Sequence, residues 1–353
     1  MTAERGPALR TADFDYPLPE HLVASHPTDR RDESRLLVLD RDTGTLADRG
    51  FPDLLEYLAE GDALVVNDTR VFPARLQGSK PTGARAEVLL LRPLPEDEEQ
   101  RTWQALVRPG GKLKPGRVVD VADSFRVTVE DSFADGSRRV RLEGDGDPWD
   151  LIERHGEVPL PPYIRRPENA TDRDRYQTVY ARERGSVAAP TAGLHFTTGL
   201  VEQIESLGVS VVPVTLHVGV GTFRPVDAEE VEDHRMHAEH FELSDRAARL
   251  LNRAREGGRR VWAVGTTSAR TLETAVSSDG SFEASKGCTD LFIHPPYRFR
   301  AVDGLLTNFH LPRSSLLMLV AAMAGRDAVL EAYRHAVERR YRFYSYGDAM
   351  LVV

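Results

Sequence analysis

The sequence has 353 residues, a length that favours two domains over one and allows a sizeable core. A hydrophobic share of 41% beside a charged share of 29% is typical of globular proteins and excludes a mainly disordered or fibrous chain. The single cysteine, Cys288, excludes an intramolecular disulfide framework and favours a reducing compartment, so we expect a cytoplasmic protein. With a net charge of −9, any nucleic-acid partner must bind a local basic surface.

The hydropathy pattern gives no sign of a membrane segment. The first ten residues lack an apolar stretch of signal-peptide length. The longest apolar run, Leu316–Ala324, is far shorter than the roughly 20 residues that cross a bilayer. We expect a monomer that does not contact membranes.

The N-terminal part predicts a strand pair and then a strand that ends in a polar turn. Residues Arg35–Asp40 form an apolar segment, and Asp42-Thr43-Gly44 is typical of the turn that follows it in a hairpin. The apolar strand Ala63–Val66 leads into Asn67-Asp68-Thr69-Arg70, whose short polar side chains can bond their own backbone. Because α/β proteins often bind ligands where strands end, this turn is a candidate site.

Residues 75–159 show short apolar segments separated by glycine and proline turns. Arg108–Lys112 and Ala134–Ser137 are typical hairpin connections, and no helix-period segment is visible. The pattern predicts a small antiparallel β-barrel or sandwich inserted into a larger domain. The expected strands are Glu87–Arg92, Trp103–Arg108, Gly116–Val121, Phe125–Glu130 and Arg138–Glu143.

After Pro167 strands and helices alternate, which predicts a layered α/β domain. Capping residues such as Thr198 and Ser244 mark helix starts, and Gly257-Gly258 marks a helix end. The expected helices are Thr198–Leu207, Asp245–Arg255, one from near Ala269, Ser315–Ala324 and Ala328–Arg339, and the expected strands are Val209–Val214, Val261–Val264 and Tyr341–Val353. The fold class is therefore α/β, with a main domain of residues 1–74 and 160–353 interrupted by a barrel of residues 75–159.

Two glycine-containing loops are candidate ligand sites. Gly265–Ser268 joins a strand to a helix and offers N–H groups, hydroxyls and the positive end of a helix dipole to a carboxylate or phosphate. Alternatively, Thr267 or Ser268 only caps the helix. Leu216–Phe223 carries two glycines that permit close approach of a flat ligand, but the third glycine of the dinucleotide fingerprint is missing, so no nicotinamide cofactor is expected.

Histidines occur in several loops. Thr191 and His195 precede a helix and can point into a cleft, although a histidine beside apolar neighbours is often only structural. His237 and Glu239 are candidates for acid or base chemistry. His234 and His237 have a spacing that suits a metal on a helix, but the residue order of zinc hydrolases and a supporting cysteine are absent, so no metal is expected.

The C-terminal region holds two further polar pairs. Asn308 and His310 are two residues apart, so an extended backbone directs both to one face; a turn without function is the alternative. Tyr344 and Tyr346, followed by Asp348, either stack on a base or fill the core. Without a serine-hydrolase elbow, a Walker loop or a cysteine nucleophile, the residues indicate an α/β enzyme but not its reaction.

Short segments follow one another along the chain in a characteristic order: Phe14–Pro19, Asn67–Arg75, Pro159–Ile164, Tyr176–Tyr180, Ala189–Phe196, Leu216–Phe223, His234–Glu239, Gly265–Ser268, Thr289–Ile293, Asp303–Pro312 and Tyr344–Asp348. In this order, the segments resemble the S-adenosylmethionine:tRNA ribosyltransferase-isomerase family of queuosine biosynthesis. The resemblance implies transfer and isomerisation of the ribosyl part of S-adenosylmethionine onto 7-aminomethyl-7-deazaguanine at the tRNA wobble position, which gives epoxyqueuosine and releases adenine and methionine. S-Adenosylmethionine is then a consumed co-substrate, and no cofactor is expected.

The resemblance also implies roles for the loop residues. His195 or His217 would be the base that removes a C5′ proton acidified by the sulfonium, with His237 or Glu239 in reserve. Asn308 and His310 would contact the adenine or ribose, and Thr266, Thr267 and Ser268 the methionine carboxylate or a tRNA phosphate. The further substrate-binding candidates are Asn67, Asp68, Arg70, Thr191, Gly193, Gly219, Gly221, Thr222, Tyr346 and Asp348. The tRNA would bind Arg108, Lys112, Lys114, Arg165, Arg166, Arg173 and Arg175.

Other functions stay open at this point. Gly83-Ala84 and Pro295-Pro296-Tyr297 depart from the usual family pattern, and with the acidic net charge they motivate a paralogue that uses S-adenosylmethionine to modify a different amine acceptor. A non-catalytic tRNA-binding protein would release no adenine. A methyltransferase would release S-adenosylhomocysteine.

Overall fold

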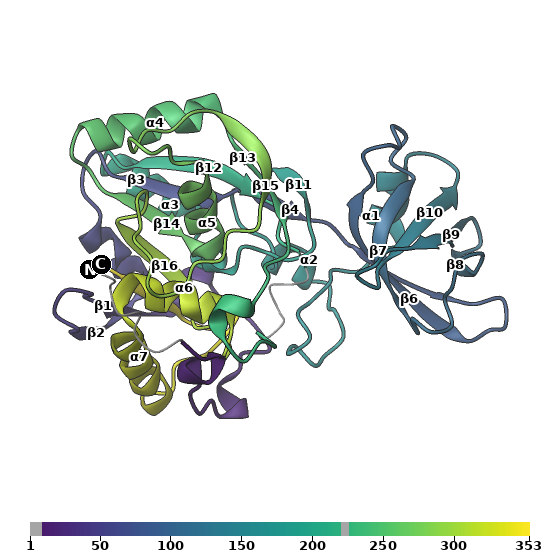
Figure 1. The fold of residues 1–353 in the computed structure, drawn as a ribbon, viewed down its shortest axis with the longest axis horizontal. Helices are drawn as coiled ribbons and strands as arrows, with labels where there is room; N and C mark the ends of the chain where they lie inside the picture. The colour runs from purple at the N-terminus through teal and green to yellow at the C-terminus, as the bar shows by residue number, and fades with distance from the viewer. Residues whose placement is uncertain (1–8, 220–225) are drawn as a thin grey trace, which may run out of the picture.

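The computed structural model describes residues 9–219 and 226–353. It contains a nine-stranded sheet flanked by helices and a closed six-stranded barrel, which stands at one end of the molecule (Figure 1). The predicted fold class is thereby confirmed. The barrel strands lie between Arg75 and Gly144, while the domain boundaries near residues 75 and 159 stay a prediction. None of the helices in the described ranges is long and apolar enough to span a bilayer.

The barrel closes in the order β10-β7-β6-β5-β8-β9. Side chains alternate along each strand, so that Phe125, Val127 and Val129 are buried while Arg126 is exposed. The strands are β5 (Arg75–Ser79), β6 (Arg85–Pro93), β7 (Thr102–Arg108), β8 (Val118–Ala122), β9 (Phe125–Ser132) and β10 (Arg138–Gly144).

A helix follows the barrel strands, and the expectation of no helix in this region was wrong. Helix α1 (Pro148–His155) begins at the cap Asp147, whose carboxylate accepts a hydrogen bond from Trp149 N at 2.8 Å. Its residues Leu151 and Ile152 pack into the barrel core. With only eight residues, it offers about two turns of hydrophobic period, too few to stand out in the sequence.

The main sheet has a parallel centre, β12-β3-β14-β16, extended by mixed strands on both sides. In sheet order the strands are β15 (Ser285–Thr289), β13 (Glu239–Leu243), β12 (Ser210–Leu216), β3 (Ala63–Asn67), β14 (Val261–Val264), β16 (Gly304–Asn308), β17 (Ala349–Val352), β1 (Arg35–Leu39) and β2 (Leu46–Gly50). The short strands β4 (Thr69–Val71) and β11 (Glu183–Ser186) pair separately.

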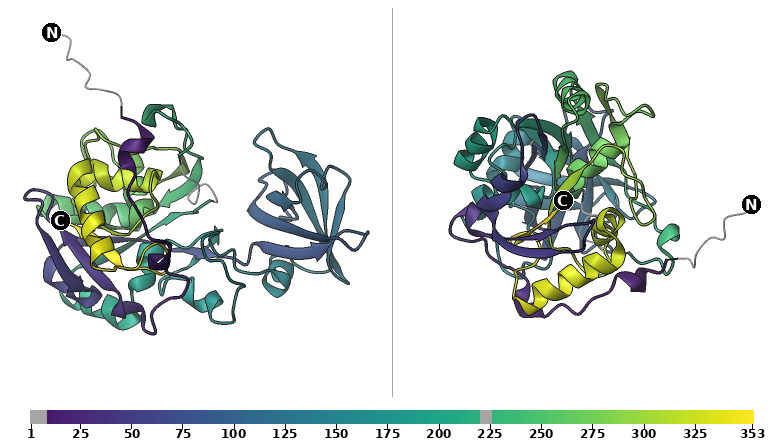
Figure 2. Two further views of the ribbon diagram at one scale, coloured as in Figure 1. Left: turned by 90° about the horizontal axis from the view of Figure 1, so that it is seen from below. Right: turned by 90° about the vertical axis from the view of Figure 1, so that its left-hand side faces the viewer.

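Helices cover both faces of the main sheet (Figure 2). Ala63 and Val65 of β3 pack into the cluster that contains α4, α5, α6 and α7, and Leu64 and Val66 pack into the cluster that contains α3, because neighbouring strand residues face opposite sides. The helices are α2 (Asp172–Arg175), α3 (Thr198–Ser206), α4 (Asp245–Glu256), α5 (Gly265–Ala275), α6 (Ser315–Ala324) and α7 (Arg326–Glu338). The 3-10 helices are η1 (Thr11–Phe14), η2 (Glu20–Leu22), η3 (Arg31–Glu33), η4 (Phe51–Tyr57), η5 (Thr191–His195) and η7 (Val231–Asp233).

Several element boundaries differ from the sequence expectation. The predicted terminal strand over residues 341–353 was wrong for residues 341–348, because Tyr344 adopts a positive φ of 71° and breaks the extended backbone. Helix α5 begins at Gly265 instead of near Ala269. The cap of α3 is Thr197, whose hydroxyl accepts a hydrogen bond from Leu200 N at 3.2 Å.

Gly304 is required by the close packing of β16 against β14. A Cβ at this position would overlap ring atoms of the buried Trp262, its partner across the strands. We expect Gly304→Ala to lower the free energy of unfolding by about 1–3 kcal/mol, because the ring must shift in a filled core. Urea unfolding followed by circular dichroism measures the change. As a control, Gly199→Ala on exposed helix surface should stabilise by about 0.5–1 kcal/mol; equal effects would contradict the explanation.

Candidate active site

Loops distant in sequence meet beyond the carboxyl ends of β14 and β16 and enclose a pocket. We call it the central pocket; it is lined mainly by residues 188–192, 265–267, 307–311 and 344–345. Ligands of α/β proteins commonly bind at this edge of a sheet. Five predicted site residues line it together, namely Thr191, Thr266, Thr267, Asn308 and His310.

Two buried polar atoms of the central pocket have no hydrogen-bond partner among the described residues. They are Thr267 Oγ1 and Asn308 Oδ1. An unsatisfied buried polar atom costs about 1–3 kcal/mol, and such atoms in native proteins call for an explanation. A bound ligand that supplies a donor to Asn308 and a polar partner to Thr267 removes this cost.

The start of helix α5 forms one wall of the central pocket. Gly265 has a φ of +86°, which a residue with a side chain rarely adopts, and the preceding Val264 provides no side-chain cap. The first N–H groups of the helix therefore lack a capping side chain beside the unpaired hydroxyl of Thr267. This combination suits a negatively charged group.

His310 contributes a neutral imidazole to the same pocket. Its Nε2 lies 2.7 Å from Thr307 Oγ1. Burial lowers the pKa of His310 to about 3, so the ring is uncharged at neutral pH.

A second pocket adjoins the central one and lies between the main sheet and the barrel. We call it the barrel-side pocket; residues 217–219 and 237–240 line it from the main sheet, and Arg92, Gln104 and Trp149 line it from the barrel side. Val218 lines both pockets. The predicted residues His217, Gly219, His237 and Glu239 all belong to it. Gly221 and Thr222 lie outside the described residues.

His217 is held firmly in the barrel-side pocket. Its Nδ1 lies 2.8 Å from Thr69 Oγ1, and its ring stacks on His240 at a centroid distance of 5.8 Å. A Cβ on Gly185 would lie 2.7 Å from His217 Nε2, so only a glycine lets this backbone pack against the ring. Burial, together with the charge of His240, lowers the pKa of His217 to about 4. The ring is therefore neutral at pH 7.

Glu239 lines this pocket and is held there by partners within the chain. One carboxylate oxygen pairs with Arg270, and the other accepts a hydrogen bond from Gly219 N at 2.9 Å. Arg270 also donates to Leu291 O at 3.1 Å. Arg270 was not predicted from the sequence, because a charged residue on a helix normally indicates an exposed position. These contacts favour a structural role for Glu239 over proton transfer.

His237 is exposed, and the helical spacing considered for it does not exist. Residues 234–238 are irregular, and Glu239 begins strand β13. In the described part of the chain, no group of three His, Cys, Asp or Glu side chains is placed to hold a metal ion.

Several predicted residues do not line either pocket. Asn67 bridges two strands by accepting from Leu216 N at 3.1 Å and donating to Leu216 O at 2.9 Å. Asp68 accepts a hydrogen bond from Thr215, and burial raises its pKa. Arg70 is exposed on β4.

Four other predicted residues have structural contacts as well. Ser268 donates to Val264 O at 2.8 Å within its own helix. A Cβ on Gly193 would overlap the Tyr180 hydroxyl, so this glycine serves packing. The backbone N–H groups of residues 35 and 342 donate to Asp348. Tyr346 donates to Asp172 at 3.0 Å and lines a smaller hollow with His195.

The predicted tRNA-binding residues fall into two groups. Arg108, Lys112 and Lys114 are exposed on the barrel. The other four lie in the segment that connects the barrel to the main sheet, where their guanidinium groups make contacts within the chain.

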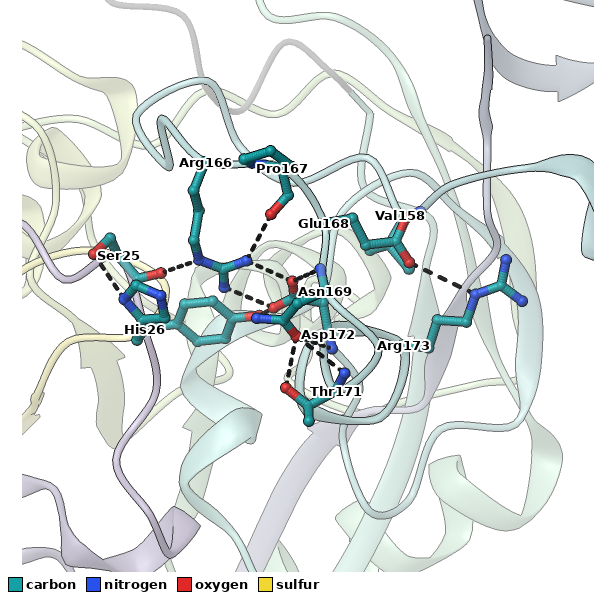
Figure 3. Close-up of polar contacts among 11 residues, drawn as sticks. Ser25, His26, Val158, Arg166, Pro167, Glu168, Asn169, Thr171, Asp172 and Arg173 are labelled. Atoms are coloured by element: carbon teal, nitrogen blue, oxygen red, sulfur yellow. Dashed lines mark hydrogen bonds and ion pairs between the residues drawn. The ribbon is translucent and has the colours of Figure 1, made fainter.

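Figure 3 shows Arg166 holding both carboxylate oxygens of Asp172, at 2.6 and 2.8 Å, and Arg173 beside Glu168. Arg165 pairs with Glu20, and Arg175 donates to two backbone carbonyls, Thr28 O and Asp29 O. The contacts of Arg166, Arg173 and Arg175 favour a role in fixing the connecting segment, whereas the Arg165–Glu20 pair is 80% and 82% exposed and contributes little.

Tyr163 and Tyr344 also line the central pocket; Tyr163 was not predicted, and Tyr344 was considered only as a stacking or core residue. Their rings lie 4.7 Å apart, and the hydroxyl of Tyr163 is 2.5 Å from Ser345 Oγ. A positive φ on a residue as large as Tyr344 is costly and is found most often at functional sites. The alternation of Tyr344 and Tyr346 predicted a regular strand here, and this hid the position of Tyr344.

Comparison with known proteins gives a consistent result. The family model described as queuosine biosynthesis protein matches residues 11–352. The S-adenosylmethionine:tRNA ribosyltransferase-isomerase of Syntrophomonas wolfei is 53% identical over 348 residues, which are 98% of this chain and 97% of the relative. The crystal structure of S-adenosylmethionine tRNA ribosyltransferase from Thermotoga maritima is similar with a TM-score of 0.55 and 39% identity, covering 97% of this chain and 100% of that one.

Proposed function

Since the chain belongs to the queuosine biosynthesis protein family, we propose that its central and barrel-side pockets together carry S-adenosylmethionine:tRNA ribosyltransferase-isomerase activity. The enzyme transfers and isomerises the ribosyl part of S-adenosylmethionine, a consumed co-substrate, and releases adenine and methionine. The acceptor is the aminomethyl group of 7-aminomethyl-7-deazaguanine in tRNA, and the product is epoxyqueuosine. Family membership does not favour a different amine acceptor.

The observation that carries the placement of S-adenosylmethionine is the pair of unpartnered atoms in the central pocket. Asn308 Oδ1 needs a hydrogen-bond donor, and Thr267 Oγ1 lies beside the uncapped start of α5, where a carboxylate fits. S-Adenosylmethionine carries both kinds of group. We place its methionine carboxylate at Thr266 and Thr267 and its adenosine toward Asn308 and His310.

The reaction begins with loss of a proton from C5′, whose acidity the adjacent sulfonium raises. His217 is the base that the geometry favours, because its ring is neutral and lines the barrel-side pocket, and because Thr69 contacts Nδ1 and not Nε2. Adenine leaves more easily when one of its nitrogens is protonated. Methionine then departs as a neutral thioether when the epoxide closes.

The function is tested by incubating the protein with S-adenosylmethionine and tRNA that carries 7-aminomethyl-7-deazaguanine. Mass spectrometry of the digested tRNA should show epoxyqueuosine, with adenine and methionine released in equal amounts. Release of S-adenosylhomocysteine would indicate a methyltransferase instead. Absence of adenine release would leave a non-catalytic tRNA-binding protein, and adenine release without modified tRNA would point to another acceptor.

The exposed cations of the barrel provide the expected tRNA contact. Replacing Arg108, Lys112 and Lys114 with alanine removes three phosphate partners and should reduce the slope of log Kd against log salt by about 2 to 3. Fluorescence binding titrations between about 50 and 200 mM salt measure the slope. The matched control replaces Arg334, Arg339 and Arg340 at the end of α7, far from the barrel (Figure 1). An equal loss of slope in both variants would argue against this surface.

A further inference from the structure

His195 contacts the side-chain amide of Asn308 and does not itself line the central pocket. Asn308 ends β16 and forms part of the wall of that pocket. Asn308 Nδ2 is 3.1 Å from His195 Nε2 and 3.1 Å from Tyr344 O. A backbone carbonyl only accepts hydrogen bonds, so the amide atom that faces Tyr344 must be the nitrogen. Each of the two amide hydrogens then donates one hydrogen bond, so rotating the amide by half a turn would break both bonds.

The ring of His195 is fixed by its other contacts. Because Nε2 accepts from Asn308, the ring proton sits on Nδ1, which is 2.7 Å from Ser34 Oγ. The ring stacks on Phe51 at a centroid distance of 4.9 Å. Burial, aided by the charges of Arg342 and Arg31, lowers the pKa of His195 to about 3 and keeps the ring neutral.

These contacts argue against His195 as the base. Both ring nitrogens already have partners, and the ring lines the smaller hollow instead of the central pocket. A general base must reach the proton that it removes. The ring instead controls the direction of the Asn308 amide. The oxygen of this amide is one of the two buried atoms of the central pocket without a hydrogen-bond partner.

We propose that His195 is a positioning residue that holds the Asn308 amide so that its oxygen accepts a hydrogen bond from an N–H or O–H group of S-adenosylmethionine. This inference rests on the proposed function. It assigns recognition of the co-substrate to Asn308, with Ser34 and Phe51 supporting it through the His195 ring. The proton abstraction then belongs to a different side chain.

Two nearly isosteric substitutions test the proposal in the full chain. Glutamine and methionine have similar shapes, but only glutamine carries an oxygen that can accept the hydrogen bond from Asn308. By calorimetric titration with S-adenosylmethionine, His195→Met should weaken binding about tenfold or more, and His195→Gln should stay within about threefold of wild type. Equal affinities of the two variants would overturn the proposal.

A double-mutant cycle tests whether His195 acts through Asn308. The variant His195→Met/Asn308→Ala should bind S-adenosylmethionine no more weakly than Asn308→Ala alone, because the ring has no other route to the ligand. Additive losses would overturn the proposal. If His195→Met reduces the folded fraction, Ser34→Ala replaces it in the same cycle with an expected loss of about threefold.

Kinetics separate positioning from proton transfer. If His195 is a positioning residue, the variant His195→Met should have a raised KM for S-adenosylmethionine. Its kcat at saturation and its pH profile should both stay near the wild-type values. A fall in kcat of about 100-fold or more in both His195→Met and His195→Gln would identify His195 as the base and overturn the proposal. Wild-type protein that does not bind S-adenosylmethionine would contradict the proposed function itself, so the two failures are distinguishable.

Discussion

Replacing His217 with alanine is expected to lower kcat by about 100- to 10,000-fold, the usual contribution of a positioned general base. The imidazole is neutral, lines the barrel-side pocket, and is held by Thr69 at Nδ1 and by stacking on His240. Alanine removes the proton acceptor without removing the pocket. Single-turnover release of adenine with saturating S-adenosylmethionine and tRNA measures the chemical step directly.

The matched control is His240→Ala, which removes the exposed stacking partner and leaves His217 in place. We expect this control to keep kcat within about tenfold of wild type, since it alters the base only through its surroundings. His217→Ala with near wild-type kcat would rule out His217 as the base.

The pH dependence of wild type gives a second check on His217. Its pKa is lowered to about 4 by burial, so the ring is in its proton-accepting form at neutral pH. Protonation of His217 should therefore reduce kcat/KM only as the pH falls through about 4. An acid limb near the ordinary histidine pKa of about 6.5 would point to a different, exposed histidine.

Arg270→Met is expected to lower the free energy of unfolding by about 3–5 kcal/mol. The side chains of Arg270 and Glu239 are only 4% and 7% exposed, so removing the cation leaves a buried carboxylate without its counter-charge. The loss should also disturb the barrel-side pocket, because Glu239 holds Gly219 N. Urea unfolding of the variant and wild type measures the difference.

An exposed ion pair supplies the control for this prediction. Arg249 and Asp245 on α4 are 65% and 69% exposed, and Arg249→Ala should change stability by less than about 1 kcal/mol. The double variant Arg270→Met/Glu239→Leu removes both buried charges and should recover much of the loss. If Arg270→Met is no more destabilising than Arg249→Ala, the prediction that the buried ion pair of Arg270 and Glu239 stabilises the fold is wrong.

Local sequence patterns determined much of the fold. Helix α6 and strand β14 have their predicted bounds, because a serine cap and a short apolar run are signals contained in neighbouring residues. Five of the six barrel strands were recognised from the turns between them, whereas β5 was not predicted and α1 was too short to show a helical period. The family resemblance rests on segments read directly from the sequence, and the family model matches residues 11–352.

Tertiary structure alone decided how the polar loops are used. Sequence analysis named His195, Asn308 and Thr267 side by side as site residues, but only the packing sets His195 behind Asn308 and leaves atoms of the other two unpaired in a pocket. It also buried Arg270 against Glu239, which lies on a different element. The contact between His195 and Asn308 joins residues 113 positions apart, so it depends on strand order and loop direction, which no local spacing encodes.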